Sequence, residues 1–164
     1  MQETETTNLP DFSDISRCPD NGRVLSLDLG TKKVGVASCD ITQTVVKPHP
    51  NLKRTAWKLF LITIKQHIKE LDAVALVLGL PINLDDSDNL MSLDAKRLAR
   101  NFTLSLDIPV FLQDERVTTL AAGENLYDLG IHGKKRLARI DSEAACLILI
   151  DFLDTKRMQW QLKK

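Results

Sequence analysis

The stretch VLSLDLGTKKVGVASCD, residues 24–40, decides the fold of this chain. Its two aliphatic halves are joined by a Gly-Thr-Lys-Lys turn, a pattern that predicts a β-hairpin. Asp28 ends the first strand of that hairpin. An ionised carboxylate in a half-buried position is costly unless a positive group lies near it, and a divalent metal or a neighbouring lysine would supply that charge. The simpler alternative is an aspartate that bonds the backbone of the turn.

Working outward, a third strand is expected at residues 44–47, ended by Pro48 and Pro50. Hydrophobic periodicity then predicts further strands at 73–78 and 109–112 and helices at 54–71, 92–106, from Thr118 or Thr119 to Leu129, and 141–153. Three successive strands followed by alternating helices and strands predict an α/β fold. Its mixed five-stranded sheet would combine a three-strand antiparallel meander with two parallel strands and carry helices on its faces.

Composition sets broad limits on the function. The 164 residues, 43% hydrophobic and 27% charged, are typical of one globular domain. No apolar run approaches the roughly 18 residues that span a membrane, so no membrane partner is expected. The polar, acidic N-terminus does not resemble a signal peptide. Three widely spaced cysteines form no metal-ligand pair, which favours a reducing, cytoplasmic location.

Charge is distributed unevenly along the chain, although its formal net charge is zero. Residues 1–22 hold five acids and one base and few aliphatic side chains, so we expect a disordered acidic extension there. The folded domain would span residues 23–154, and residues 155–164 would form a basic tail. The net charge of +4 on residues 23–164 permits phosphate binding without requiring it.

Acidic residues occur at three places where active sites of open α/β sheets gather, the carboxyl ends of strands and a facing helix start. They are Asp28, the Asp114-Glu115 pair and Asp141. Converging carboxylates repel one another unless cations lie between them, and oxygen ligands suit Mg²⁺ or Mn²⁺. Alternatively, Asp141 is only a helix N-cap, and Glu115 and Arg116 form a surface ion pair. No nucleophilic triad and no glycine-rich phosphate loop is present.

Four motifs, LDLGTKKVGVA, LVLGLPINLDDS, QDERVTT and IDSEAACLIL, together resemble in order and spacing the YqgF/RuvX family. Its members are described as pre-16S rRNA nucleases and as Holliday-junction-resolvase-like proteins. The resemblance covers residues 23–154 and implies a ribonuclease H-like fold and a metal-dependent phosphodiesterase. The chain departs from the family at Lys33, where arginine is usual, and at Asp86, where a glycine before the serine is common.

The resemblance also implies site residues. Asp28, Glu115 and Asp141 would be catalytic and would bind Mg²⁺ or Mn²⁺, with Asp114 as a fallback ligand. In the ribonuclease H strand order one strand separates Asp28 from Glu115, a backbone distance of about 10 Å that a glutamate side chain and a metal could close. Contacts to nucleic acid would come from basic residues, the last four in a loop over residues 131–139: Lys32, Lys33, Arg116, Lys134, Lys135, Arg136 and Arg139.

The resulting hypothesis is a cytoplasmic, metal-dependent nuclease, a monomer or a homodimer, that acts on structured RNA at the 5′ end of pre-16S rRNA. One alternative is a resolvase that cuts branched DNA with the same metal site. Another is a ribosome-assembly factor that binds RNA without catalysis. The DxGT sequence also resembles the first phosphate motif of actin-like ATPases and sugar kinases, but those need a second domain and this chain is too short.

Overall fold

The computed structural model describes residues 9–115 and 134–164, and the side chains of these residues except those of 134–141. Five strands form one sheet in the order β3-β2-β1-β4-β5. The pairs β1–β2 and β2–β3 are antiparallel, and β1–β4 and β4–β5 are parallel. The strands are β1 (Arg23–Leu29), β2 (Lys33–Cys39), β3 (Val46–Lys53), β4 (Ala73–Leu80) and β5 (Val110–Asp114). The predicted mixed sheet, a meander plus two parallel strands, is therefore confirmed.

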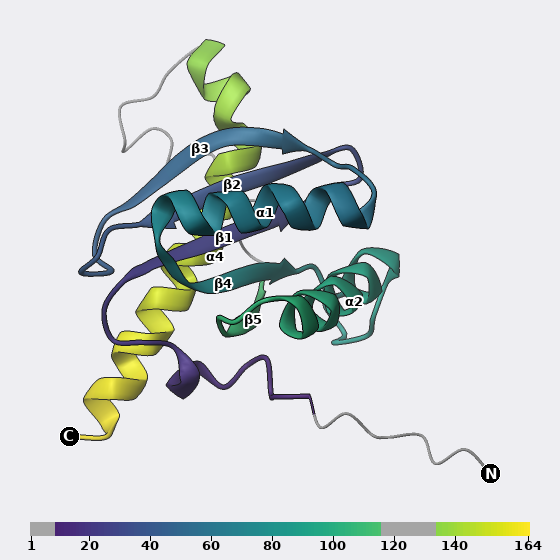
Figure 1. Cartoon of the computed structure of the whole chain (residues 1–164). Coiled ribbons are helices and arrows are strands. Elements are labelled where there is room, and N and C mark those ends of the chain that lie inside the picture. Colours follow the sequence, from purple (N-terminus) through teal and green to yellow (C-terminus); the bar gives the residue numbers. More distant parts are fainter. Residues whose placement is uncertain (1–8, 116–133) are drawn as a thin grey trace.

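Helices cover both faces of this sheet (Figure 1). One face carries α1 (Trp57–Leu71) and α2 (Leu90–Ser105), and the other carries α4 (Lys134–Leu162). Side chains alternate along each strand, so successive residues enter different cores. Leu25 and Leu27 pack with Phe60 and Phe102 under α1 and α2, whereas Val24 packs on the α4 side. Residues on β1 with even numbers consequently face α4.

The N-terminal segment is ordered from residue 9 onward, so its predicted disorder is wrong for residues 9–22. It forms a short 3-10 helix, η1 (Ile15–Arg17), whose Ile15 and Cys18 are buried in the core beneath α4. Arg17 donates to the backbone carbonyl of Val110 at 3.0 Å and lies over the Phe111 ring at 4.7 Å. These contacts cross to the opposite edge of the sheet, and local hydropathy did not indicate them. Residues 1–8 lie outside the described range.

The C-terminal helix is much longer than predicted, because α4 runs through both the expected basic loop and the expected tail. Residues 134–139 are therefore helix where a loop was predicted, and residues 155–162 of the expected basic tail continue the same helix. Arg157 pairs with Asp154 at 2.8 Å and donates to the carbonyl of Gln43 at 2.7 Å, which ties the polar end of the helix to the β2–β3 turn. The predicted helix from Thr118 or Thr119 to Leu129 lies outside the described residues.

The third strand is displaced from its expected position, because β3 contains the two prolines that were expected to end it. β3 is an edge strand, where the missing proline N–H leaves no ladder bond unmade on the open side. The predicted helices and strands elsewhere agree within about three residues. Across the part of the chain that the structure describes, none of the helices has the length and apolar character needed to cross a membrane.

Candidate active site

Asp28 lies next to the last residue of β1, at the carboxyl end of the strand. Its neighbours Leu27 and Leu29 are both buried in the core under α1 and α2, so the Asp28 side chain projects from the other face, toward α4. Its partner in the hairpin is Gly35, which has no side chain. Asp28 is half-buried at this position. The carboxylate thus stands on the α4 face of the sheet.

Glu115 reaches Asp28 across an intervening strand. It follows the last residue of β5, and its backbone N–H bonds the carbonyl of Leu80 on β4 at 3.3 Å. Between the two acids lies Gly79 of β4, where an added Cβ would overlap Glu115 Oε2 and lie 2.6 Å from Ile148 Cδ1. The absence of a side chain at Gly79 therefore leaves the space through which the Glu115 carboxyl passes. From the sequence, Gly79 was expected only to mark the end of the strand predicted at 73–78.

The two carboxyl groups are in contact and share a hydrogen bond. Burial, the charge of Asp28, that hydrogen bond and the charge of Asp114 raise the pKa of Glu115 from its usual 4.5 to about 8. All four contributions act in the same direction. Near neutral pH the pair therefore holds a proton in place of a second negative charge.

Asp114, the fallback ligand, belongs to the other face of β5. Phe111 packs in the core under α4 and Val110 in the opposite core, so alternation places Asp114 with Val110 and Glu115 with Phe111. In register, Asp114 pairs with Leu80. Of the two adjacent acids, Glu115 is thus the one that shares a face with Asp28. Asp114 still contributes negative charge that raises the Glu115 pKa.

Asp141 lies inside α4, so the alternative that it is only an N-cap is wrong. Its side chain is outside the described part of the structure. The next residue, Ser142, is fully buried and fastens this turn of the helix to the sheet. Ser142 Oγ lies 2.6 Å from the His49 carbonyl and accepts from the Val36 N–H at 3.4 Å. Val36 is next to Gly35, which pairs with Asp28 in the hairpin. The turn of α4 that contains Asp141 is therefore fastened to the sheet close to Asp28.

Among the described side chains, the candidate metal site has two ligands. No cluster of three histidine, cysteine, aspartate or glutamate residues occurs in the described part of the chain. Asp28 and Glu115 supply two carboxylates, and hard carboxylate oxygens are the donors that Mg²⁺ and Mn²⁺ prefer. A divalent cation between the two carboxyl groups would also relieve their mutual repulsion. The donor chemistry therefore fits such an ion.

The predicted basic turn lies beside the carboxylates. Lys32 and Lys33 are exposed, and the turn is closed by a bond from the Gly30 N–H to the Lys33 carbonyl at 2.9 Å. Arg54, which the sequence reasoning did not select, donates to the Gly30 carbonyl at 3.2 Å and pairs with Asp94 at 2.7 Å. Lys53 is paired with Lys33 across β2 and β3 and adds a further exposed charge.

The remaining predicted contacts to nucleic acid have no described side chains. Arg116 lies outside the described residues. The other four belong to the first turns of the α4 helix, where a loop was predicted: Lys134, Lys135, Arg136 and Arg139.

In the loop after Pro81, Asp86 has φ of 67°, the left-handed conformation that glycine adopts most readily. Asp86 is the position at which a glycine is common in the resembling family.

The fold places the chain in the ribonuclease H-like class. Thermus thermophilus RuvC, solved in complex with a Holliday junction substrate, has a TM-score of 0.51 with 14% identity, over 83% of this chain and 96% of that one. The fowlpox virus Holliday junction resolvase has a TM-score of 0.50, also with 14% identity, over 81% and 98% of the two chains. At these identities the likeness shows the fold alone.

Within that class, the chain belongs to the RuvX family. The family, described as "RuvX: Holliday junction resolvase", matches residues 22–155. A relative from Sphingopyxis alaskensis is 37% identical over 149 residues, covering 91% of this chain and 96% of its own length. One from Thiobacillus denitrificans is 37% identical over 142 residues, covering 87% and 98%. Both carry the name "Putative pre-16S rRNA nuclease", and nucleases are hydrolases of phosphodiester bonds.

Proposed function

We propose that this protein is a metal-dependent nuclease that hydrolyses phosphodiester bonds in structured RNA and processes the 5′ end of pre-16S rRNA. The observation that carries the proposal is the contact between the carboxyl groups of Asp28 and Glu115, made possible by Gly79. A half-buried pair of acids whose mutual repulsion raises the pKa of one of them is typical of a functional site, and of one that binds a cation. The RNA substrate is proposed from the names of the relatives.

Asp28 and Glu115 would hold Mg²⁺ or Mn²⁺, with Asp141 as the third ligand. Bound ions of this kind activate a water molecule and stabilise the leaving oxygen of a phosphodiester. Glu115 must lose its proton before it can act as a full ligand, because burial and Asp28 keep its pKa near 8. The hydrogen bond from Asp28 to Glu115 would fix the position of the Glu115 carboxyl group.

The exposed lysines beside this pair would hold the nucleic-acid backbone. Lys32 and Lys33 lie in the turn that directly follows Asp28, and Arg54 keeps that turn in place through the Gly30 carbonyl. Lysine contacts to phosphate supply affinity and position without reading sequence. Substrate choice would then depend on the shape of the nucleic acid. The basic residues at the start of α4 would extend the same positive surface.

A second candidate is cleavage of branched DNA, which the shared fold with two Holliday junction resolvases favours. Two cuts in a symmetric junction would require a homodimer, whereas trimming of an rRNA precursor requires only one site. The cytoplasm is the proposed location for either activity. All three cysteines are buried free thiols, as expected in a reducing compartment.

Cleavage of two labelled substrates, a pre-16S rRNA leader and a four-way DNA junction, tests the proposal. Wild type, Asp28→Asn and the control Asp107→Asn, at an exposed turn outside the site, are compared with Mg²⁺, Mn²⁺ or EDTA. We expect cation-dependent cleavage of the RNA by wild type and the control, and none by Asp28→Asn. Preferred cleavage of the junction would select the resolvase activity. RNA binding without cleavage of either substrate would replace the nuclease with a non-catalytic assembly factor.

A further inference from the structure

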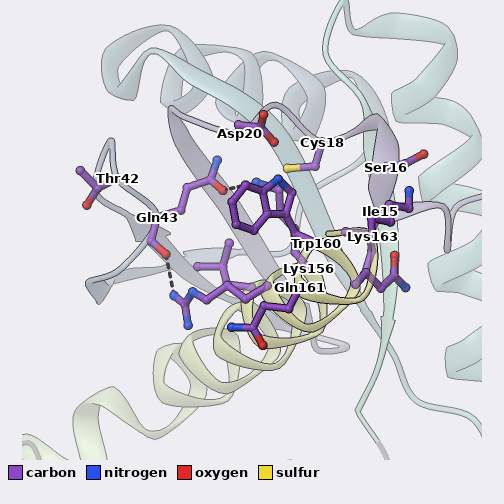
Figure 2. A pocket seen from close by; sticks show the side chains of 13 residues that line it. Ile15, Ser16, Cys18, Asp20, Thr42, Gln43, Lys156, Trp160, Gln161 and Lys163 are labelled. Atoms are coloured by element: carbon purple, nitrogen blue, oxygen red, sulfur yellow. Dashed lines mark hydrogen bonds between the residues drawn. The ribbon is translucent and has the colours of Figure 1, made fainter.

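A cavity lies beside the last turns of α4 (Figure 2). It has a volume of about 520 Å³, which is within the roughly 300–1,000 Å³ typical of sites for small organic ligands. The last turns of α4, η1 and the turn between β2 and β3 form its walls. That turn bonds Gly22, just before β1, whereas Asp28 is near the end of β1. At about 3.3 Å per residue, the chain from Gly22 to Asp28 is about 20 Å long.

An aromatic surface over an apolar floor is the first feature of this cavity. Ile15, Cys18 and Leu153, all buried, form the floor. The Trp160 side chain lies within the cavity in Figure 2 and is 54% exposed. A tryptophan ring that is half exposed to a cavity offers a planar stacking partner to another ring. The Lys164 ammonium lies 3.8 Å from the centroid of the Trp160 ring.

Positive charge around the aromatic ring is the second feature. The Lys156 ammonium donates to the Pro19 carbonyl at 2.9 Å and to Gln43 Oε1 at 2.7 Å, both uncharged oxygens. Its charge is therefore fixed in position without a carboxylate partner in the described part of the chain. Lys163 adds an exposed ammonium to the lining, and Asp20 is the one acid among the described lining residues. The cavity thus combines a stacking surface with excess positive charge.

We propose that this cavity binds a nucleotide unit, with the base stacked on Trp160 and the phosphate near Lys163 and Lys156. A planar ring that carries a negative phosphate matches both features, and base stacking on an aromatic side chain is a recurrent mode of single-strand binding. A single-stranded segment of RNA is the source that the proposed function would supply, and the inference rests on that function to this extent. A free mononucleotide offers the same chemistry.

The fluorescence of Trp160 tests this proposal directly. The chain has two tryptophans, and Trp57 packs against Phe102 with ring centroids 5.0 Å apart. In a Trp57→Phe variant, Trp160 becomes the sole reporter. We expect a single-stranded oligoribonucleotide to quench its emission in a saturable and salt-dependent way. Quenching by adenosine monophosphate at similar concentrations would assign the cavity to free nucleotides. An absence of quenching by either probe would overturn the proposal.

Anisotropy of a labelled oligoribonucleotide gives a second measurement with a matched control. Met158 is 64% exposed on the same helix and does not line the cavity. We expect Trp160→Ala to weaken binding about tenfold, since a stacked base contributes roughly 1–3 kcal/mol, and Met158→Ala to leave it unchanged. Equal affinity of both variants and wild type would contradict the proposal, as would binding of a tryptophan-containing peptide in preference to RNA.

The proposed nucleotide pocket and the proposed nuclease activity can be refuted independently of each other. Asp28→Asn changes an acid about 20 Å away along β1, so quenching of Trp160 should persist in an Asp28→Asn/Trp57→Phe double variant. Persistent quenching together with an inactive wild type would retain the nucleotide pocket and reject the proposed nuclease. Cleavage by wild type without any quenching would retain the nuclease and reject the pocket.

Discussion

Glu115 and Asp28 share a hydrogen bond although β4 lies between β5, which Glu115 follows, and β1, which carries Asp28. The contact exists because Gly79, on that intervening strand, has no Cβ to obstruct the Glu115 carboxyl. Burial and the charge of Asp28 raise the pKa of Glu115 to about 8, so the pair shares a proton near neutral pH. The arrangement is therefore unfavourable for the metal-free protein and favourable for binding a divalent cation.

Gly79→Ala should separate the pair. The new methyl group would overlap Glu115 Oε2 and press on Ile148, so the carboxyl must move. We expect Mn²⁺ affinity and cleavage rate to fall about a hundredfold, since small displacements of catalytic groups have effects of this size. Steady-state cleavage and calorimetric Mn²⁺ titration would measure both.

A double variant separates this displacement from general overpacking. Gly79→Ala/Ile148→Val removes the methyl group that meets the new Cβ, and should recover most of the roughly 1–3 kcal/mol that overpacking costs. Activity should stay low, because the overlap with Glu115 remains. Full recovery of activity in the double variant would show that packing, not the carboxyl position, explains the loss.

The stability of the metal-free protein should fall as pH rises from about 4.5 to about 8. In this window the unfolded Glu115 has lost its proton and the folded Glu115 keeps it, because its pKa is raised in the folded state. The contribution of this one proton to the free energy of unfolding then decreases by at most about 1.4 kcal/mol per pH unit. Chemical denaturation of wild type in EDTA across this range would measure the slope.

Glu115→Gln should flatten that part of the pH profile, whereas Asp28→Asn should flatten it only partly, because burial is the largest cause of the raised pKa. Mn²⁺ should raise the melting temperature more at pH 8 than at pH 6, since binding must displace the proton. An identical slope in wild type and Glu115→Gln would exclude Glu115 as the group responsible.

Ser142 should act as a positioning residue for Asp141. Its hydroxyl holds the adjacent turn of α4 to the His49 carbonyl at 2.6 Å. Ser26 makes a comparable buried bond to the Ala145 carbonyl, one turn further along the same helix, at 2.8 Å. Loss of either bond should cost about 1–3 kcal/mol of stability. We expect Ser142→Ala to lower kcat and leave KM nearly unchanged.

The matched variant is Ser26→Ala, which should match Ser142→Ala in melting temperature yet keep near wild-type kcat. Equal losses of kcat in the two variants would reduce Ser142 to a structural role. Ser142→Thr keeps the hydroxyl and should recover part of the rate.

Asp86→Gly should stabilise the loop after Pro81. Asp86 has φ of 67°, where a residue with a side chain is disfavoured by roughly 1–2 kcal/mol relative to glycine. Part of that gain is offset by the greater backbone freedom of glycine in the unfolded chain. The melting temperature should therefore rise slightly for Asp86→Gly and fall for Asp86→Val. A lower melting temperature for Asp86→Gly would mean that contacts of the aspartate outweigh its backbone cost.

Strands β1, β2, β4 and β5 could be predicted because each has a clear hydrophobic signal, and Val24, Val77 and Phe111 all lie in the core. β3 has no such signal and contains two prolines, so its position was misplaced. The nearness of Asp28 and Glu115 could be expected only from the family resemblance, because it depends on Gly79, a residue whose role is a missing side chain. The choice of Glu115 over Asp114 needed the face of β5, which alternation from Phe111 supplies.

Other features had weak or misleading local signals. Ile15 and Cys18 are isolated apolar residues in a polar stretch, and their burial depends on α4 more than 100 residues later. The ends of α4 are polar, so periodicity could not extend the helix beyond its apolar centre, although Lys156 and Arg157 fix its last turns to the β2–β3 turn. Tertiary contacts override local propensity in both cases.

A calorimetric titration with Mn²⁺ at pH 8 tests the central claim most directly. Wild type should bind the ion, and Asp28→Asn and Glu115→Gln should each lose most of that affinity. Asp114→Asn, which changes the adjacent acid on the opposite face of β5, should retain it. Unchanged Mn²⁺ binding by Asp28→Asn and Glu115→Gln, or loss of binding in Asp114→Asn alone, would contradict the carboxylate pair as the metal site.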